Sequence, residues 1–515
     1  MSISLKSSPL RKKITWQVKP KARAWQALGL TFVAGGLLNF AFAPYRALWL
    51  APLVLAVLYR VLLSGSWRQA FARGFMFGVG LFLFGVSWTY STLERFGGMP
   101  APVAAIACGI FMAILAAYIG LVAAAFARLR TGTDFDPWLF AALWVMGEWV
   151  RGTFLTGFPW LDLGYAATYP TLLPWAAVIG VLGLSFVVAL AGALVAEAVR
   201  GRTVGLLAIL IFLLASPLVT RLSFVHPTGR AVTASLIQGD ISPNVKWDPD
   251  TQDAIIHRYW KLTQKSDGVL VVWPETAVPE FSHDLRRHFI PRLKRWAEIN
   301  HRHFLFGLIE GDEASDGPIY NAVMSVGRHD GFYRKRHLVP FGEYLPWPAL
   351  LNPILNVLHI PMASFTAWPT REGALKAAGL RLGLSICYEV AYGSLVTQAL
   401  PQATLLVNVS DDSWYGHSNE AHQQLQIAQV RAAEAGRDML IATNDGVTAL
   451  IGHTGRIVAR LPPFRPGVLT VVVRSYQGLT PYDRIGNKGI LLFAALLLSW
   501  GMVFLWRRKS LSMRP

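Results

Sequence analysis

The chain has 515 residues, of which 53% are hydrophobic and only 15% are charged, and its mean hydropathy is +0.39. Soluble domains carry about 25% charged residues, so this composition excludes an ordinary soluble protein and predicts membrane spans. The 48 Lys and Arg residues exceed the 30 Asp and Glu residues, giving a formal net charge of +18. Membrane topology accounts for this excess better than a nucleic-acid partner does.

Eight apolar stretches are long enough to cross about 30 Å of hydrocarbon. They run roughly over residues 25–43, 47–63, 74–90, 103–127, 137–155, 173–199, 204–219 and 489–506. Glu148 and Arg151 lie in the fifth stretch, three residues apart. Pairing with each other is the simpler expectation, and contact with a substrate head group is the alternative. An even number of spans places both chain ends on one side of the membrane.

Lys and Arg residues are concentrated before the first span, after the last span and in the loops on that side. The positive-inside rule therefore predicts a multi-pass membrane protein with both termini in the cytoplasm. In a bacterium this membrane would be the inner membrane, and the opposite face would be the periplasm. The first span is long and leads directly into another, so we interpret it as an uncleaved anchor.

The predicted topology divides the chain into three parts. Residues 1–221 form a membrane domain of about seven spans, residues 222–486 form a periplasmic domain large enough for its own core, and residues 487–515 form the last span with a basic cytoplasmic tail.

The periplasmic segment has an α/β pattern. Runs rich in β-branched residues predict strands at 231–238, 268–273, 303–310, 380–387, 403–409, 440–444 and 468–473. Apolar spacings of three and four predict helices at 253–264, 286–299 and 421–435. A sheet covered by helices follows.

Three of the predicted strand ends carry reactive side chains, and ligands of open α/β sheets usually lie at such ends. Glu275 is the next-to-last residue of the run Gly-Val-Leu-Val-Val-Trp-Pro-Glu-Thr over 268–276. A carboxylate at the end of a buried strand is poorly hydrated, which favours its use as a base. Taken alone, a Pro-Glu pair is more typical of a surface turn.

Lys335 and Glu343 belong to the segment Tyr-Arg-Lys-Arg-His-Leu-Val-Pro-Phe-Gly-Glu over 333–343. An ammonium that enters this apolar segment would be partly desolvated and would require an anionic partner. A solvated lysine is the plainer interpretation of the lysine alone.

Cys387 follows an apolar strand in Arg-Leu-Gly-Leu-Ser-Ile-Cys-Tyr-Glu over 381–389, and Cys108 lies in an apolar run. Two cysteines are too few for a disulfide framework, so we expect free thiols. Buried cysteines are usually inert packing residues. A cysteine on a sharp turn after a strand, however, can have nearby backbone N–H groups that lower its pKa and stabilise an oxyanion.

These motifs in combination resemble the carbon–nitrogen hydrolase (nitrilase) superfamily. The quoted segments, together with Asp-x-Trp-Tyr-Gly at 412–416, carry the resemblance. It implies an α-β-β-α sandwich in which Glu275 is the general base, Lys335 the electrostatic stabiliser and Cys387 the nucleophile. The arrangement of seven spans, this domain and a final span resembles a membrane-embedded branch of the superfamily, the bacterial apolipoprotein N-acyltransferases.

The resemblance also assigns accessory positions. It implies accessory roles for Glu343, Glu389 and Tyr388, and substrate-binding roles for Trp247, Asn321, Trp414 and Tyr415. No metal and no cofactor are expected. Ser-Asp-Asp at 410–412, where relatives often carry Asn in the middle, and Asp445 depart from the family pattern.

The function that the resemblance implies is acyl transfer from a phospholipid, phosphatidylethanolamine or phosphatidylglycerol, to the α-amino group of the diacylglyceryl-cysteine of apolipoproteins. A thiol nucleophile predicts a thioester intermediate and ping-pong kinetics. The spans would let the acyl chain reach the thiol without crossing water, and the apolar segment 344–368 is either a membrane-facing lid or a loop packed on its own domain.

Two other functions remain open from the residues. One is a membrane-tethered amidase that uses water as the final acceptor, and the other is a transporter or lipid-binding scaffold, against which the lack of an apparent repeat argues mildly. We expect a monomer.

Overall fold

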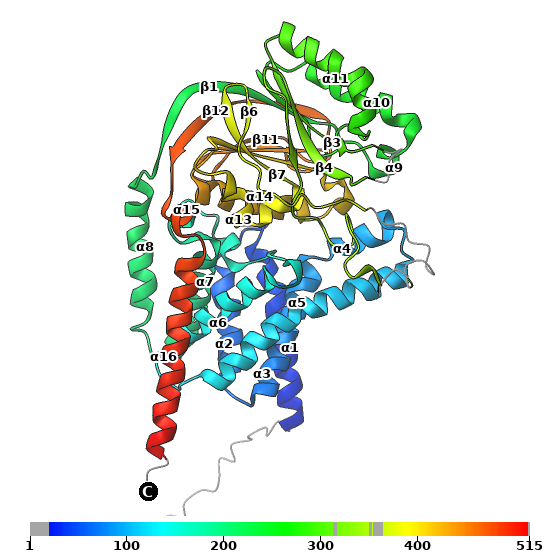
Figure 1. The fold of residues 1–515 in the computed structure, drawn as a ribbon. Coiled ribbons are helices and arrows are strands. Elements are labelled where there is room, and N and C mark those ends of the chain that lie inside the picture. Colours follow the sequence, from blue (N-terminus) through cyan, green and yellow to red (C-terminus); the bar gives the residue numbers. More distant parts are fainter. Residues whose placement is uncertain (1–19, 313–316, 350–352, 354–363, 513–515) are drawn as a thin grey trace, which may run out of the picture.

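The computed structural model describes residues 20–312, 317–349, 353 and 364–512. A helical part lies below a two-sheet domain, and both α1 and α16, which come from opposite ends of the chain, belong to the helical part (Figure 1). The chain therefore leaves the helical part once, builds the two-sheet domain, and returns to it.

Each apolar stretch predicted as a span forms a helix. The helices of this part are α1 (Pro20–Leu38), α2 (Leu50–Leu62), α3 (Trp67–Gly85), α4 (Trp88–Ser91), α5 (Ala101–Leu129), α6 (Asp136–Arg151), α7 (Ala176–Ala198), α8 (Leu206–Arg221) and α16 (Lys488–Ser512). Leu214 of α8 and Trp500 of α16 are among many large apolar side chains that remain exposed on these helices. Such apolar outer faces are typical of helices in contact with lipid.

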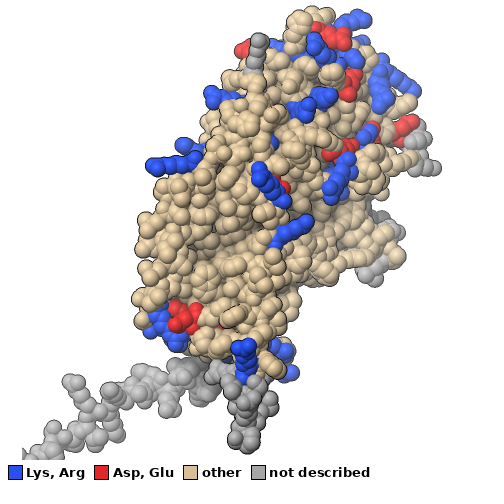
Figure 2. Space-filling model, turned by 60° about the vertical axis from the view of Figure 1, so that its left-hand side comes forward, with Lys and Arg blue, Asp and Glu red and all other residues tan. Residues whose placement is uncertain are grey.

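Four helices within the described residues are long and apolar enough to cross a membrane: Ala24–Ala41, Ala101–Leu129, Leu173–Ala198 and Lys488–Arg507. The pair Trp67–Gly85 and Trp88–Phe96, bent by 55°, would make a fifth, whereas α2 and α8 are shorter apolar helices. The face in Figure 2 shows a broad band of largely uncharged surface between two charged ends. Spans are therefore present, and their number of about eight stays a prediction.

The expected pair of Glu148 and Arg151 is wrong. Arg151 Nη2 instead pairs with Asp162 at 2.5 Å, and its Nη1 donates to the carbonyl of Trp160. Glu148 Oε1 accepts from the Trp144 indole at 2.8 Å and from Leu163 N–H at 2.9 Å. The sequence spacing could not reveal Asp162, because it lies in the loop after α6.

The upper domain contains two six-stranded sheets. The first has the order β12-β1-β2-β3-β4-β5 and the second β11-β10-β9-β8-β7-β6. Strands of the first are β1 (Val225–Gln238), β2 (Leu270–Val272), β3 (His303–Glu310), β4 (Tyr320–Val326), β5 (Gly331–Arg334) and β12 (Gly467–Gly478). Strands of the second are β6 (Leu375–Ala377), β7 (Leu380–Ile386), β8 (Leu405–Ser410), β9 (Met439–Thr443), β10 (Ala449–Ile451) and β11 (Ile457–Arg460).

Successive side chains along each strand point to opposite faces of the sheet, and this alternation separates the layers of the domain. Leu236 and Leu305 of the first sheet share a core with Leu406 of the second, whereas Val271 and Phe304 face the helices on the other side. The helices are α9 (Pro243–Lys246), α10 (Gln252–Thr263), α11 (Ser282–Ile299), α13 (Gly393–Val396), α14 (Glu420–Ala435) and α15 (Pro481–Ile485). Because α10 and α11 cover the first sheet and α14 packs on the second, the predicted α-β-β-α sandwich is confirmed.

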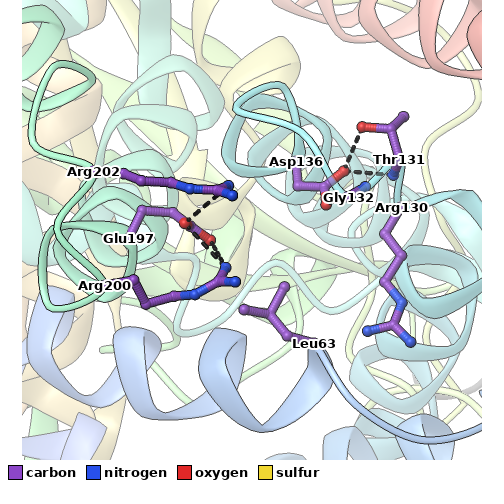
Figure 3. A pocket seen from close by; sticks show the side chains of 8 residues that line it. All are labelled: Leu63, Arg130, Thr131, Gly132, Asp136, Glu197, Arg200 and Arg202. Atoms are coloured by element: carbon purple, nitrogen blue, oxygen red, sulfur yellow. Dashed lines mark hydrogen bonds and ion pairs between the residues drawn. The ribbon is translucent and has the colours of Figure 1, made fainter.

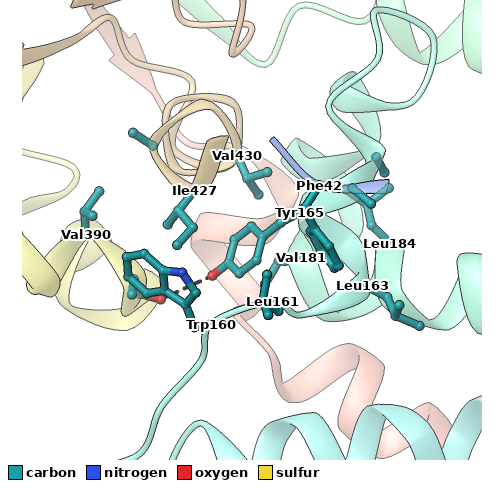
Figure 4. Close-up of a cluster of buried hydrophobic side chains, with 14 of the residues drawn as sticks. Phe42, Trp160, Leu161, Leu163, Tyr165, Val181, Leu184, Val390, Ile427 and Val430 are labelled. Carbon is teal, nitrogen blue, oxygen red and sulfur yellow. Dashed lines mark hydrogen bonds between the residues drawn. The ribbon is translucent and has the colours of Figure 1, made fainter. Parts of the chain in front are cut away.

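Helix α14 joins the sandwich to the helical part, because it is buried on both of its faces. Gln423 Oε1 accepts hydrogen bonds from the indoles of Trp88 at 3.2 Å and Trp160 at 2.7 Å, and its Nε2 donates to Gly85 O. Apolar side chains of α14 and of the loop before α7 fill the space around these bonds, among them Ile427 and Tyr165 (Figure 4). The two parts therefore share a continuous core.

Candidate active site

Glu275, Lys335 and Cys387 each lie just beyond the end of a strand, after β2, β5 and β7 respectively. The first two strands belong to one sheet and the third to the other. Because the sheets are packed face to face, these strand ends meet, and all three side chains are buried. The structure therefore brings together the three residues that the sequence singled out.

Cys387 sits on a strained turn, since its φ of 50° lies in the left-handed region that L residues avoid. Two side chains hold this turn: Glu389 Oε2 accepts from Ile386 N–H at 2.8 Å, and Asn408 Nδ2 donates to Cys387 O at 3.2 Å. Conformations of this kind persist only when their surroundings impose them. The predicted sharp turn is therefore present.

The prediction that the turn lowers the thiol pKa is wrong. Burial raises the pKa of Cys387 well above its usual value, Glu275 raises it further, and Lys335 opposes them. Desolvation disfavours the thiolate more than one ammonium stabilises it. This pKa favours the thiol form of Cys387, so an attack by its sulfur would require a base to take the proton.

Lys335 lies between two carboxylates. Its Nζ is 2.9 Å from Glu343 Oε1 and 3.2 Å from Glu275 Oε1, and the residue is 1% exposed. Burial alone would lower its pKa, but Glu275 and Glu343 raise the pKa of this ammonium well above its usual value. Lys335 therefore carries a permanent positive charge next to the thiol.

Glu275 is fixed at both carboxylate oxygens. Oε1 accepts from Lys335 and, at 2.7 Å, from Asn321 Nδ2, whereas Oε2 accepts from Asp411 N–H at 2.9 Å. The same Asn321 amide donates to Glu343 Oε1 at 2.8 Å. Asn321 thus supports two carboxylates, and its expected substrate contact stays a prediction.

Sequence reasoning missed Lys246, a second buried lysine at the site. Its Nζ forms an ion pair with Asp411 and donates to Glu275 O at 3.2 Å. Asp411 is the middle residue of Ser-Asp-Asp, one of the departures from the family pattern, and Asn444 Nδ2 also donates to it at 2.9 Å. A lysine next to the predicted Trp247 gave no sign of burial, because it lies in a short polar segment before α10.

Glu389 connects the loop of the lysine to the turn of the cysteine. Besides Ile386, its donors are the backbone N–H groups of Arg336 at 2.8 Å and His337 at 3.1 Å, and the Tyr333 hydroxyl at 2.8 Å. These bonds use both of its oxygens. Glu389, expected as an accessory residue, therefore supports the two loops.

The predicted aromatic residues lie where the sandwich meets the helical part. The Tyr388 hydroxyl donates to Gly157 O at 3.0 Å, and the ring of Tyr415 lies 4.8 Å from that of Trp88. Trp414 packs against Phe96, with 5.6 Å between the ring centroids. Trp247 differs, since it is 40% exposed and its ring lies 5.8 Å from Lys246 Nζ.

A second buried carboxyl lies near the thiol. Ser410 lowers the pKa of Cys387 slightly, against the effect of burial, and the Ser410 hydroxyl donates to Asp412 Oδ1 at 2.5 Å. Burial raises the pKa of Asp412 to about 7. Burial and the neighbouring Asp411 raise the pKa of Asp445, the other departure from the family pattern, to about 9.

The predicted lid covers residues 344–368. Residues 350–352 and 354–363 of this segment lie outside the described residues.

Two family models match the chain. The model described as the apolipoprotein N-acyltransferase N-terminal domain matches residues 34–194, and the carbon–nitrogen hydrolase model matches residues 233–481. The first match covers much of the helical part, and the second covers the two-sheet domain with its three strand ends.

Curated proteins similar over nearly the whole chain include the apolipoprotein N-acyltransferases of three bacteria. That of Methylococcus capsulatus is 38% identical, with 95% of this chain and 97% of that protein covered. That of Nitrosomonas europaea is 39% identical over 94% of this chain and 98% of its own length. That of Azotobacter vinelandii is 38% identical, with 96% of this chain and 97% of that protein covered.

The sandwich and the buried site at its strand ends thus define a membrane-associated enzyme of the carbon–nitrogen hydrolase superfamily. The helical part matches the model of the apolipoprotein N-acyltransferase N-terminal domain. The chain belongs to the apolipoprotein N-acyltransferase family, and it is an acyl-transferring enzyme.

Proposed function

We propose that the enzyme transfers a fatty acyl group from a membrane phospholipid to the α-amino group of the diacylglyceryl-cysteine of apolipoproteins. The relatives named above support this acceptor by their names. The observation that carries the chemistry is the meeting of Glu275, Lys335 and Cys387 in one buried site beside the helical part. Phosphatidylethanolamine and phosphatidylglycerol are the proposed donors, and the enzyme is proposed to act as a monomer.

The first half-reaction forms an acyl-enzyme. Cys387 Sγ attacks the ester carbonyl carbon while Glu275 takes the thiol proton, and the charge of Lys335 stabilises the oxyanion. Collapse breaks the ester C–O bond, and Glu275 returns the proton to the leaving alkoxide. The products are a lysophospholipid and a thioester on Cys387.

The second half-reaction uses the same groups. The acceptor amine attacks the thioester carbon, Glu275 takes a proton from nitrogen, the C–S bond breaks, and the proton returns to sulfur. The product is an amide, which is more stable than the thioester. Two substrates that use one nucleophile in turn predict ping-pong kinetics.

The contact with the helical part explains why a membrane donor suits this site. Tyr388, the residue after the nucleophile, bonds to Gly157 in the loop that follows α6. An acyl chain delivered along the helical part would reach the thiol without exposing its methylene groups to water, at about 0.8 kcal/mol for each group. Buried surroundings also exclude water from the thioester and thus favour transfer over hydrolysis.

The proposed topology keeps both termini in the cytoplasm, residues 222–486 in the periplasm and about eight spans in the inner membrane. Helices α2, α6 and α8 each pack against the long helix α7. This packing supports the proposal that α2, α6 and α8 also span the membrane, although they are shorter.

An assay of the acylated product tests the proposal. Detergent-solubilised enzyme is incubated with phosphatidylethanolamine and a synthetic diacylglyceryl-cysteinyl peptide, and the peptide is analysed by mass spectrometry. We expect one added acyl group on the amine, loss of this product with Cys387→Ser, and retention with Cys108→Ser. Hydrolysis of simple amides without any peptide acylation would contradict the proposal and favour an amidase.

A further inference from the structure

A hollow of about 320 Å³ opens at the end of the helical part farthest from the catalytic domain. Its walls come from the ends of α2, α5 and α7 and from the start of α6. The opposite ends of α6 and α7 face the catalytic domain, since Arg151 binds the loop under Tyr388 and Val181 N–H donates to Glu434 of α14. The hollow is therefore separate from the thiol site.

One wall of the hollow carries two arginines that are held by a buried acid. Glu197 pairs with Arg200 Nη1 at 2.8 Å and with Arg202 Nη1 at 3.6 Å, and it also accepts from the Tyr59 hydroxyl at 3.2 Å. Figure 3 shows both guanidinium groups reaching across the hollow towards the loop that carries Arg130 and Asp136. Glu197, which is itself held by Tyr59, thus holds both arginines in defined positions.

The facing wall adds a third guanidinium and a second acid that is already used. Asp136 accepts from Thr131 N–H at 2.6 Å, from the Thr131 hydroxyl at 2.9 Å and from Gly132 N–H at 2.9 Å. Arg130 makes two long bonds, 3.3 and 3.4 Å, to the carbonyls of Leu62 and Gly65. A third acid beside the hollow, the exposed Asp134, pairs with Arg202 Nη1 at 3.2 Å. All three carboxylates are therefore engaged with protein donors.

The hollow contains more hydrogen-bond donors, on its arginines, than hydrogen-bond acceptors, on its carboxylates. A guanidinium has five N–H donors, and Arg200 and Arg202 each use a single nitrogen in their ion pairs. A ligand that only accepts hydrogen bonds and carries negative charge fits this set, and the planar fork of arginine matches phosphate oxygens in particular.

The surroundings point to a lipid as the carrier of that phosphate. Trp67 begins α3 at the same end, and the guanidinium groups of Arg128 and Arg68 lie 4.4 and 5.4 Å from its ring centroid. Tryptophan with flanking arginines is typical of the depth at which phospholipid head groups lie. Basic pockets between the ends of membrane helices are a known way of holding anionic head groups.

We propose that this hollow binds the phosphate group of an anionic phospholipid through Arg130, Arg200 and Arg202. The site is distinct from the proposed acyl-donor site and lies at the other end of the helical part. Its occupant is held by the head group and is not consumed by the reaction.

Native mass spectrometry of the full-length protein tests the proposal. The protein is reconstituted with equal amounts of phosphatidylglycerol and phosphatidylcholine and then released from lipid. We expect wild type to retain phosphatidylglycerol selectively, and Arg200→Gln with Arg202→Gln to reduce that retention by at least about tenfold. Arg221→Gln, which removes an exposed arginine at the end of α8, is the matched control and should leave retention unchanged.

Further arms make every outcome informative. Lysine at both positions should retain an intermediate amount, because it keeps the charge but not the fork, and acylation activity confirms that each variant is folded. If millimolar inorganic phosphate displaces the lipid, the site takes phosphate from either source; if it does not, the lipid is required. Equal retention in wild type and the double glutamine variant would overturn the proposal.

Discussion

Lys246 Nζ lies 3.2 Å from the main-chain oxygen of Glu275, so the proposed general base is held through its backbone by a second buried lysine. The same ammonium forms an ion pair with Asp411, whose N–H donates to Glu275 Oε2. Glu275, which takes up a proton twice in the proposed cycle, is therefore fixed at its backbone and at its side chain.

The first prediction follows from this support. Lys246→Met should destabilise the protein by about 3–5 kcal/mol, because it leaves Asp411 buried without its partner, and it should slow acylation. Thermal unfolding and single-turnover kinetics measure the two effects. Adding Asp411→Asn should recover most of the stability, since the variant pair is neutral; no recovery would show that the ion pair is not the cause.

Glu343 provides a second prediction. Glu343→Gln removes one of the two carboxylates that keep Lys335 charged, so acyl-enzyme formation should slow by about 10- to 100-fold. Glu275→Gln should lose acyl-enzyme formation altogether, because the base itself is gone. Rapid-quench measurement of lysophospholipid release distinguishes them, and equal rates for the two variants would contradict the separate roles.

Asp445 gives a prediction about pH. Burial and Asp411 raise its pKa from the usual carboxyl value of 3.8 to about 9. Between these two pKa values the unfolded chain has lost a proton that the folded protein keeps, so folding becomes less favourable as pH rises through this window. Asp445→Asn should therefore gain unfolding temperature over wild type progressively from pH 5 to pH 9; a constant difference would refute this assignment.

Gln423 allows a test of how tightly the two parts are joined. Gln423→Leu leaves the indoles of Trp88 and Trp160 and the carbonyl of Gly85 without their shared partner. Each unsatisfied buried group costs about 1–3 kcal/mol, so the unfolding temperature should fall clearly. Gln264→Leu, at an exposed position, is the control, and a similar fall in both variants would argue against a special role for the interface.

The sequence predicted the strands that lie in continuous apolar runs, and it missed strands whose apolar pattern is interrupted or brief. The seven expected strands all form, because each is a run of β-branched residues, and the three expected helices form within a few residues of their predicted ends. Strand β4 escaped prediction because Asn321 and Ser325 interrupt its apolar pattern. The short strands β6 and β10 depend on their neighbours in the second sheet.

The site also contains residues that the sequence predicted and residues that it missed. Glu275, Lys335 and Cys387 stand at the ends of recognisable segments, so their meeting could be predicted. Lys246 is part of the site only because the segment after β1 lies against Glu275 in the fold. The raised pKa of the thiol depends on burial that one sequence does not reveal.

The most direct test of the account is the intact mass of the purified enzyme after incubation with phosphatidylethanolamine. For wild type we predict a mass increase of one fatty acyl group, which hydroxylamine removes and which a diacylglyceryl-cysteinyl peptide also removes by accepting the acyl group. Cys387→Ser should show no mass increase that hydroxylamine removes. Cys108→Ser should behave as wild type. Transfer to the peptide by an enzyme that never carries the acyl group would contradict the thioester on Cys387.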